Sequence, residues 1–240
     1  MALSFLNATL KSATDALINA ISANCDHLYF PFRKYLTVYI HSVKHGGIIV
    51  LILQENIGSG RHRHCYQHPF DNHKCIKTLY NPDDGGLKEV KREVSYYLKK
   101  TDSIQACRAI PNYYGTVQTN FGTGYVFDLV TDYDGEISKS LAFYIKHKRM
   151  PMPVLEQKIA ELRDTLIEHG ISTMTLKEYN VLVRKAAPHE YSLVVIDNIG
   201  EAEFVPVASY IPFLHRRKVD RLIQRFKHRI HKVSRTAQAL

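Results

Sequence analysis

Thr175-Leu176-Lys177-Glu178-Tyr179-Asn180 runs directly into the apolar segment Val181-Leu182-Val183. Its β-branched residues predict a buried strand that begins directly after Asn180. A second apolar run, residues 192–197, predicts another strand, and that strand ends at Asp197. The side-chain oxygens of Asn180 and Asp197 are the hard ligands that Mg²⁺ prefers. We therefore expect Asn180 and Asp197 to bind Mg²⁺ together; the plain alternative is that Asp197 only forms the turn that ends the strand.

This order of residues is typical of the catalytic loop of protein kinases, which reads Asp-Leu-x-x-x-Asn. Leu176 and Asn180 match that loop, and Lys177 matches the lysine that commonly follows the Asp by two residues. Thr175 stands in place of the Asp. We expect Lys177 to help neutralise charge in phosphoryl transfer, but the hydroxyl of Thr175 is not a useful base at neutral pH. Losing a general base typically costs roughly 10²- to 10⁴-fold in rate, so slow catalysis survives in principle.

Three other side chains could replace the missing base, namely His169, Glu178 and Glu201. A second departure concerns the substrate, because only 40 residues follow Gly200 and they contain no Ala-Pro-Glu segment. No run of further helices is left to build a peptide-binding platform. We therefore expect any phosphate acceptor to be a small molecule or an envelope glycolipid.

Gly58-Ser59-Gly60 lies between two predicted strands. Because glycine lacks a Cβ atom, Gly58 and Gly60 would let backbone N–H groups approach phosphate oxygens. Arg63 replaces the third glycine of a kinase phosphate loop, and the plain alternative is an ordinary hairpin turn. We expect Gly58 and Gly60 to cover the phosphates of a nucleotide.

Cys75-Ile76-Lys77 lies on the next predicted strand, which is the setting of the kinase lysine that grips nucleotide phosphates. The helix that follows carries Glu89 and Glu93 one turn apart. We expect Glu93 to pair with Lys77, because its separation from Lys77 is nearer that found in kinases. The alternative is that both glutamates belong to a solvated helix face.

The remaining pattern predicts an α+β, protein-kinase-like fold of two lobes. Residues 47–130 would form a five-stranded antiparallel sheet with one helix, and residues 131–240 a reduced, mainly helical lobe. Asp128-Leu129-Val130 would connect the lobes, where the backbone of Asp128 and Val130 could receive an adenine edge. The expected cofactors are ATP and Mg²⁺. The predicted strands are 48–53, 64–67, 74–80, 113–119, 124–130, 181–184 and 192–197, and the predicted helices are 87–100, 138–149, 154–169 and 213–233.

Residues 1–46 are expected to form an N-terminal extension, amphipathic or poorly ordered, because apolar residues recur there at helical spacing until Gly46-Gly47. No basic segment precedes the first apolar residues, so we expect no signal peptide, and no stretch is convincing as a membrane span. The four cysteines show no regular spacing, which favours a reducing compartment. We expect a cytoplasmic location, which includes the periphery of the inner membrane.

The formal charge of +9 is concentrated in the C-terminal segment, where nine Lys and Arg residues face one Asp after residue 215. An apolar stripe, represented by Val219, Phe226 and Ile230, lies opposite these cations at helical spacing. The plainest interpretation is a helix that packs its stripe on the second lobe. An anionic membrane surface or a regulatory protein are alternative partners, and nucleic acid is disfavoured because no reader motif accompanies the helix.

A zinc site is a competing interpretation of a cluster of imidazoles and thiols within fourteen residues. The cluster shows no recognised ligand spacing, and polar side chains beside a phosphate loop explain it as well. Its members are His62, His64, Cys65, His68, His73 and Cys75.

The sequence also resembles the YrbL family, over about residues 53–232. The family consists of bacterial proteins described as members of the PhoP regulatory network, with a kinase-like domain. The resemblance implies a connection to magnesium or envelope-stress signalling and supplies no reaction. It is carried by Ile57-Gly58-Ser59-Gly60-Arg61-His62-Arg63-His64-Cys65-Tyr66, Cys75-Ile76-Lys77, Gly115-Thr116-Val117-Gln118-Thr119-Asn120-Phe121-Gly122-Thr123-Gly124-Tyr125, Thr173-Met174-Thr175-Leu176-Lys177 and Asp197-Asn198-Ile199-Gly200-Glu201.

Three functions remain open from the sequence. The first is a nucleotide-binding pseudokinase that acts in regulation, and the second is an active ATP-dependent kinase on a small molecule or envelope glycolipid. The third is an interaction protein that binds no nucleotide and uses its basic tail on a membrane or partner. A carboxylate that reaches the acceptor site in place of Thr175 would favour the second over the first.

Overall fold

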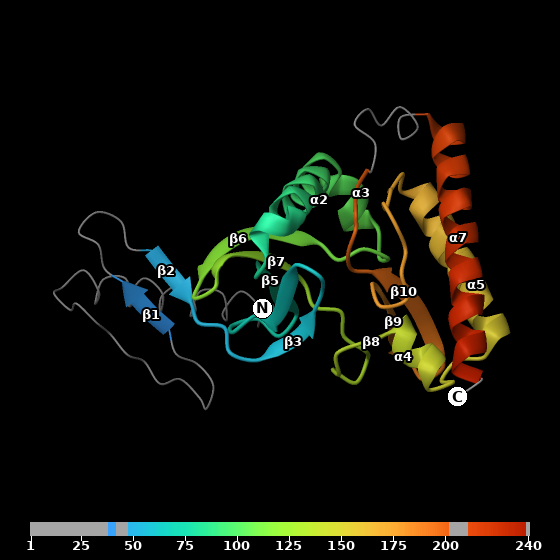
Figure 1. The fold of residues 1–240 in the computed structure, drawn as a ribbon, viewed down its shortest axis with the longest axis horizontal. Helices are drawn as coiled ribbons and strands as arrows, with labels where there is room; N and C mark the ends of the chain where they lie inside the picture. Colours follow the sequence, from blue (N-terminus) through green and yellow to red (C-terminus); the bar gives the residue numbers. More distant parts are fainter. Residues whose placement is uncertain (1–37, 42–47, 202–210, 239–240) are drawn as a thin grey trace, which may run out of the picture.

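The structure, a computed structural model, describes residues 38–41, 48–201 and 211–238. In chain order the elements are β1 (Val38–His41), β2 (Ile48–Leu51), β3 (Asn56–Ser59), β4 (Arg63–Gln67), β5 (Lys74–Leu79), the turn η1 (Pro82–Gly86), α2 (Leu87–Lys99), α3 (Thr101–Ala106), β6 (Tyr113–Thr119), β7 (Gly122–Asp128), β8 (Lys139–Ser140), α4 (Leu141–Lys146), α5 (Met152–Glu168), β9 (Val181–Ala187), β10 (Glu190–Val195) and α7 (Pro212–Gln238). The large sheet with α2 and α3 forms one half of this α+β molecule, here called the sheet half (Figure 1). In the other, helical half, α4, α5 and α7 gather around a small sheet of β10, β9 and β8.

The large sheet contains seven strands in the order β1-β2-β6-β7-β5-β4-β3. Five of them, from β6 to β3 in that order, pair antiparallel with their neighbours, and four of these five, all but β3, are strands that the sequence predicts. At the far edge β2 pairs in parallel with β6 and antiparallel with β1, so the whole sheet is mixed.

The predicted strand at 48–53 has a different place in the sheet from the expected one. The sequence placed it first in a three-strand meander, but β3 holds that position and the predicted run forms β2 beside β6. The reason lies in the turn between β6 and β7. There the Asn120 side chain accepts a hydrogen bond from the N–H of Leu53 at 2.9 Å and donates one to its carbonyl at 3.2 Å. These bonds hold the chain at the β6 edge.

The two faces of the large sheet bury different side chains, because successive residues of a strand point to opposite faces. Ile76 and Val126 belong to a small cluster on one face, whereas Cys75 and Phe127 belong to the main core on the other. Tyr97 of α2 packs edge-on against Phe127, with ring centroids 5.4 Å apart. The main core continues through α5 and α7, so the two halves share one hydrophobic interior.

Helix α2 was predicted at 87–100 and turns one narrow face toward the core. Val90, Tyr96 and Tyr97 are buried on that face, together with the charged Glu93. A buried carboxylate on an apolar face needs a partner, so Glu93 is the side chain of this helix that packing alone does not explain. The helix enters through Gly86, where a Cβ atom would lie 2.4 Å from the carbonyl oxygen of Asn81.

Helices α5 and α7 pack together in the helical half (Figure 1). The apolar stripe of α7 is buried, which confirms the interpretation that the C-terminal helix packs its stripe on the second half of the chain. The stripe consists of Val219, Leu222, Ile223, Phe226 and Ile230.

Most of the expected N-terminal extension lies outside the described residues. Within it, only β1 is described, and β1 pairs with β2 through Tyr39 opposite Val50. None of the helices in the described part of the chain combines the length and the apolar character that crossing a membrane requires.

Candidate functional site

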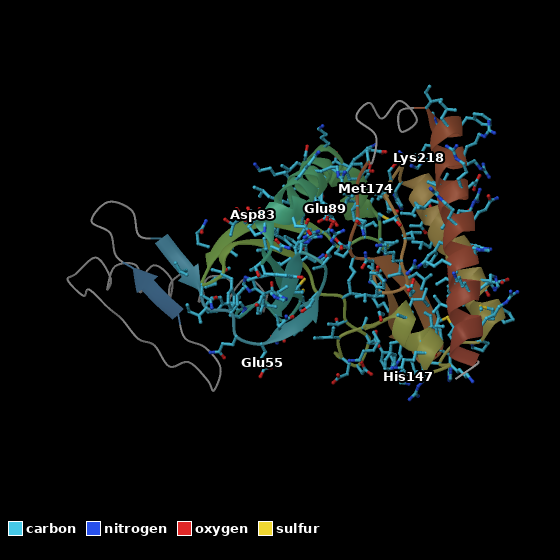
Figure 2. All side chains as sticks on the ribbon, viewed as in Figure 1. Glu55, Asp83, Glu89, His147, Met174 and Lys218 are labelled. Atoms are coloured by element: carbon cyan, nitrogen blue, oxygen red, sulfur yellow. The ribbon has the colours of Figure 1, made fainter. Side chains whose placement is uncertain are left out.

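Five residues with polar side chains lie near one another where the sheet half meets the helical half. They arise from β4, β5, α2, the loop before β9 and the segment after β10. Met174, just before that loop, marks the same central region (Figure 2). We call this set the junction site; it consists of Arg63, Lys77, Glu93, Asn180 and Asp197.

Arg63 is the centre of the junction site. Its Nη1 lies 2.5 Å from Oε2 of Glu93, and its Nη2 donates to Oδ1 of Asp197. The exposed fractions of the side chains are 14% for Arg63, 3% for Glu93 and 34% for Asp197. One guanidinium therefore links α2 to the segment that follows β10.

The predicted ion pair between Lys77 and Glu93 is wrong, because Glu93 pairs with Arg63. A planar guanidinium presents several donors in a fixed fork and serves two carboxylates at once, which one ammonium does less well. The choice of Glu93 over Glu89 is nevertheless supported, since Glu93 is buried and Glu89 is exposed on α2 (Figure 2). From the sequence, Arg63 is only the residue that replaces a glycine. The expectation that both Glu93 and Asp197 lie near Lys77 could have indicated that a second cation is needed there.

Lys77 also reaches the segment after β10. Its Nζ donates to the carbonyl oxygen of Ile196 at 2.6 Å and lies 4.6 Å from the ring centre of Phe127. Glu93 keeps its second oxygen, Oε1, buried without a hydrogen-bond partner. Such an atom carries the full cost of desolvation until a donor reaches it.

The loop that precedes β9 runs beside the segment after β10. The carbonyl of Asn180 accepts from the N–H of Ile196 at 3.0 Å, and the N–H of Met174 donates to the carbonyl of Asn198 at 2.9 Å. The two predicted metal ligands, Asn180 and Asp197, are therefore neighbours in space, as the sequence predicts. Their role in binding Mg²⁺ stays a prediction.

Charge in the junction site favours an ionised Asp197. Burial alone would raise the pKa of this carboxyl, but the charges of Arg63 and Lys77 and the N–H of Asn198 lower it below its ordinary value. Burial would likewise lower the pKa of Arg63, and the carboxylates of Glu93 and Asp197 raise it. The site thus holds two cations, Arg63 and Lys77, and two carboxylates, Glu93 and Asp197, so that its charges balance within the protein.

The carboxylates proposed as substitute bases serve other purposes. Glu178 forms a bidentate pair with Arg229 of α7, at 2.5 and 3.0 Å, and Glu201 pairs with Lys218 of α7. Opposing burial, Arg229 lowers the pKa of Glu178, which weakens it as a base. Thr175 lies half-buried in the same loop. Both acids therefore attach α7 to the body of the molecule.

Lys177 points to a different neighbour from the expected phosphate. Its Nζ lies 5.6 Å from the ring centre of the exposed Tyr179. The third proposed substitute, His169, ends α5 as its C-cap. A part for either side chain in catalysis stays a prediction.

The predicted phosphate loop is the hairpin between β3 and β4. Gly58 lies in β3, and its N–H donates to the side chain of Asn56 at 2.8 Å. The N–H of Gly60 closes the hairpin on the carbonyl of Arg63 at 2.8 Å. Neither glycine is required by packing, because an added Cβ would meet its nearest atom only at 3.8 or 3.7 Å.

Residues 128–130, the predicted connection between the halves, already make hydrogen bonds within the protein. The carboxylate of Asp128 accepts hydrogen bonds from Asn112 and Tyr114, and its backbone carbonyl accepts one from the thiol of Cys75 at 3.5 Å. The carbonyl of Val130 accepts from the N–H of Ser138 at 3.0 Å. Recognition of a base there would have to displace or share these bonds.

The zinc interpretation gains no support from the geometry. Among the described residues, which include all six proposed ligands, no three His, Cys, Asp or Glu side chains gather as a metal site would need. His64 instead stacks on Tyr80, with ring centroids 4.2 Å apart.

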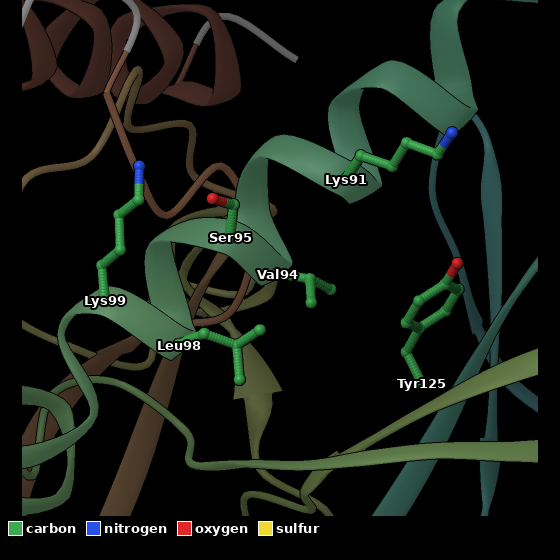
Figure 3. A pocket seen from close by; sticks show the side chains of 6 residues that line it. All are labelled: Lys91, Val94, Ser95, Leu98, Lys99 and Tyr125. Carbon is green, nitrogen blue, oxygen red and sulfur yellow. The ribbon is translucent and has the colours of Figure 1, made fainter.

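A shallow hollow of about 400 Å³ lies away from the junction site, between the outer face of α2 and β7. Five residues of α2 and Tyr125 of β7 line it (Figure 3); those of α2 are Lys91, Val94, Ser95, Leu98 and Lys99. It holds none of the site residues predicted from the sequence.

Comparison with known proteins gives a consistent result. Residues 49–231 match the family model described as PhoP regulatory network protein YrbL. The chain is 40% identical over 181 residues to the protein described as uncharacterized protein YrbL of Escherichia coli (strain K12), covering 75% of this chain and 86% of that relative. The protein of the same description from Shigella flexneri matches with the same identity and coverage. The chain belongs to the YrbL family of PhoP regulatory network proteins.

Proposed function

We propose that the junction site binds ATP with Mg²⁺ in a protein-kinase-like fold, and that the chain acts as a regulatory pseudokinase. The observation that carries the proposal is that Lys77 and Asn180, from two other parts of the chain, both bond to the backbone of Ile196 and so lie beside Asp197. The strand order β3-β4-β5-β7-β6, with α2 between β5 and β6 in the chain, supports the kinase-like comparison.

The donor set fits the proposed ligands. Asp197 supplies an ionised, one-third exposed carboxylate and Asn180 an amide, which suit a cation that also takes phosphate oxygens and water. Mg²⁺ held there would neutralise charge on the phosphates. Lys77 would exchange the carbonyl of Ile196 for a phosphate oxygen.

The glycines of the β3–β4 hairpin support the same proposal. A Cβ atom at Gly124 would lie 2.5 Å from Ile76, so packing explains that glycine, whereas Gly58 and Gly60 have room for a side chain. Packing therefore does not explain why residues 58 and 60 are glycines, whereas the close approach of a ligand to the backbone would explain it. The phosphates of a nucleotide are the ligand that the neighbouring Lys77 favours.

Regulation is favoured over phosphoryl transfer because the acceptor side lacks a base. Thr175 occupies the position of the catalytic Asp, and both Glu178 and Glu201 are paired with α7. The lowered pKa of Glu178 makes this carboxylate a poor proton acceptor at neutral pH. Membership in the PhoP regulatory network agrees with a regulatory part.

A second candidate, an interaction protein that binds no nucleotide, is favoured by one observation. Arg63 already neutralises Glu93 and Asp197, so the junction site is closed without a ligand. A nucleotide must therefore compete with Arg63 for Asp197.

A thermal-shift titration of the full chain with ATP and MgCl₂ tests the proposal. Ligand at a hundred times its Kd stabilises the native state by about 2.7 kcal/mol, which for a domain of this size raises the Tm by about 5–11 °C. Lys77→Met and Asp197→Asn should abolish the rise, while Lys74→Met, a control on the same strand that pairs with Asp71, should keep it. No rise at millimolar nucleotide would favour the interaction protein, and rapid ATP turnover would favour an active kinase.

A further inference from the structure

Helix α7 exposes a face that the proposed function does not use. Its apolar stripe is buried on the molecule, and the opposite face carries a row of cations. The helix lies along the outer edge of the helical half (Figure 1). At 1.5 Å per residue, the row from Arg217 to Arg235 spans about 27 Å. Its exposed members, here called the cationic face, are Arg217, Arg221, Arg225, Lys232 and Arg235.

The exposed positions of α7 include no carboxylate in the part whose side chains are described. Asp220 lies at the flank and is paired with Arg163 at 2.6 Å. Arg229 and Lys218 pair with Glu178 and Glu201. The acids therefore attach the helix to the body, and the cationic face retains a dense positive potential.

Apolar side chains lie at the N-terminal end of the same helix. Phe213 is 64% exposed and Ile211, just before the helix, is 44% exposed. Arg217 lies over the ring of Phe213 at 5.6 Å, so this aromatic group borders the cationic face. A large aromatic ring beside arginines, exposed to water at one end of a charged helix, fits the boundary between lipid headgroups and acyl chains.

We propose that the cationic face of α7 binds the surface of a membrane rich in anionic lipids, with Phe213 and Ile211 inserted at one end. The helix is already folded and packed, so binding requires no ordering of the chain. Because the apolar stripe is buried in the protein, attraction to lipid phosphates supplies most of the affinity and Phe213 a smaller part. Binding is therefore reversible and sensitive to salt.

Sedimentation of the full chain with vesicles tests this surface. The probe is phosphatidylcholine with about one-third phosphatidylglycerol, because each cation near such a surface contributes about 1 kcal/mol, or about fivefold in the partition coefficient. Arg217→Gln/Arg221→Gln/Arg225→Gln should weaken binding about a hundredfold. Phe213→Ser should weaken it severalfold without changing the dependence on salt.

The matched control neutralises three exposed cations of the sheet half, Lys88→Gln/Lys91→Gln/Arg92→Gln on α2. It should bind like the wild type, and an unchanged Tm in both triple variants shows that the fold is kept. Equal losses in the two triple variants, or equal binding to pure phosphatidylcholine, would overturn the proposal. So would tighter binding to a DNA duplex at the same phosphate concentration, since that result assigns the face to nucleic acid.

Discussion

Replacing Arg63 by Met tests how the two halves are held at the junction site. The substitution keeps an unbranched apolar stem but removes the group that pairs with both Glu93 and Asp197. Glu93 would then hold a charge with 3% of its side chain exposed and no partner. Removing one member of a buried pair typically costs about 3–5 kcal/mol; because Asp197 is one-third exposed, we expect the low end, about 3 kcal/mol.

Urea unfolding at neutral pH measures this loss of unfolding free energy. In a separate thermal unfolding experiment the Tm should fall by about 6–12 °C. Arg61→Met is the control, since Arg61 pairs with Asp84 at an exposed position and the same chemical change should cost less than about 1 kcal/mol there. Adding Glu93→Gln to Arg63→Met should recover part of the loss, because no unpaired charge stays buried. A loss in Arg63→Met no larger than in Arg61→Met would refute the reasoning.

Three further predictions concern stability. Glu178→Gln should destabilise the fold by about 1–2 kcal/mol in urea, whereas Glu156→Gln, whose His231 partner is nearly half exposed, should change it by less than about 0.5 kcal/mol; equal effects would contradict the assigned attachment of α7. Gly124→Ala should cost about 1–3 kcal/mol by crowding the neighbouring strand, and an unchanged unfolding midpoint would show that the strand gives way. The folded pKa of Asp197 is lowered, so its stabilisation is present above the unfolded pKa of about 3.9 and is lost as pH falls through the folded value. Unfolding midpoints measured below about pH 4 should therefore fall more steeply in the wild type than in Asp197→Asn, and parallel curves would contradict that assignment.

Local pattern was enough to predict many elements of the fold. Helix α2, the strands β4 and β9, and the buried stripe of α7 all follow from periodicity, because each element buries one face of itself. The place of β2 in the sheet did not follow, since pairing between distant strands depends on contacts such as that of Asn120 with Leu53. An apolar run therefore predicts that a strand exists, but it does not predict which other strand pairs with it.

The candidate site shows the same division. The neighbourhood of Asn180 and Asp197 could be predicted from motif spacing, because each lies at a fixed offset from a strand. The choice of Arg63 as the partner of Glu93 depends on side-chain reach across three elements, which no local spacing encodes. The attachment of Glu178 to Arg229 is likewise a contact across 51 residues of chain.

Isothermal titration of the full chain with ATP in the presence of Mg²⁺ tests the central claim most directly. We predict saturable binding of one nucleotide, dependent on Mg²⁺ and lost in Lys77→Met, with tighter binding in Arg63→Met because Asp197 is released from its ion pair. Absence of heat at millimolar nucleotide in both the wild type and Arg63→Met, or binding that Lys77→Met leaves unchanged, would contradict the assignment of the junction site to a nucleotide.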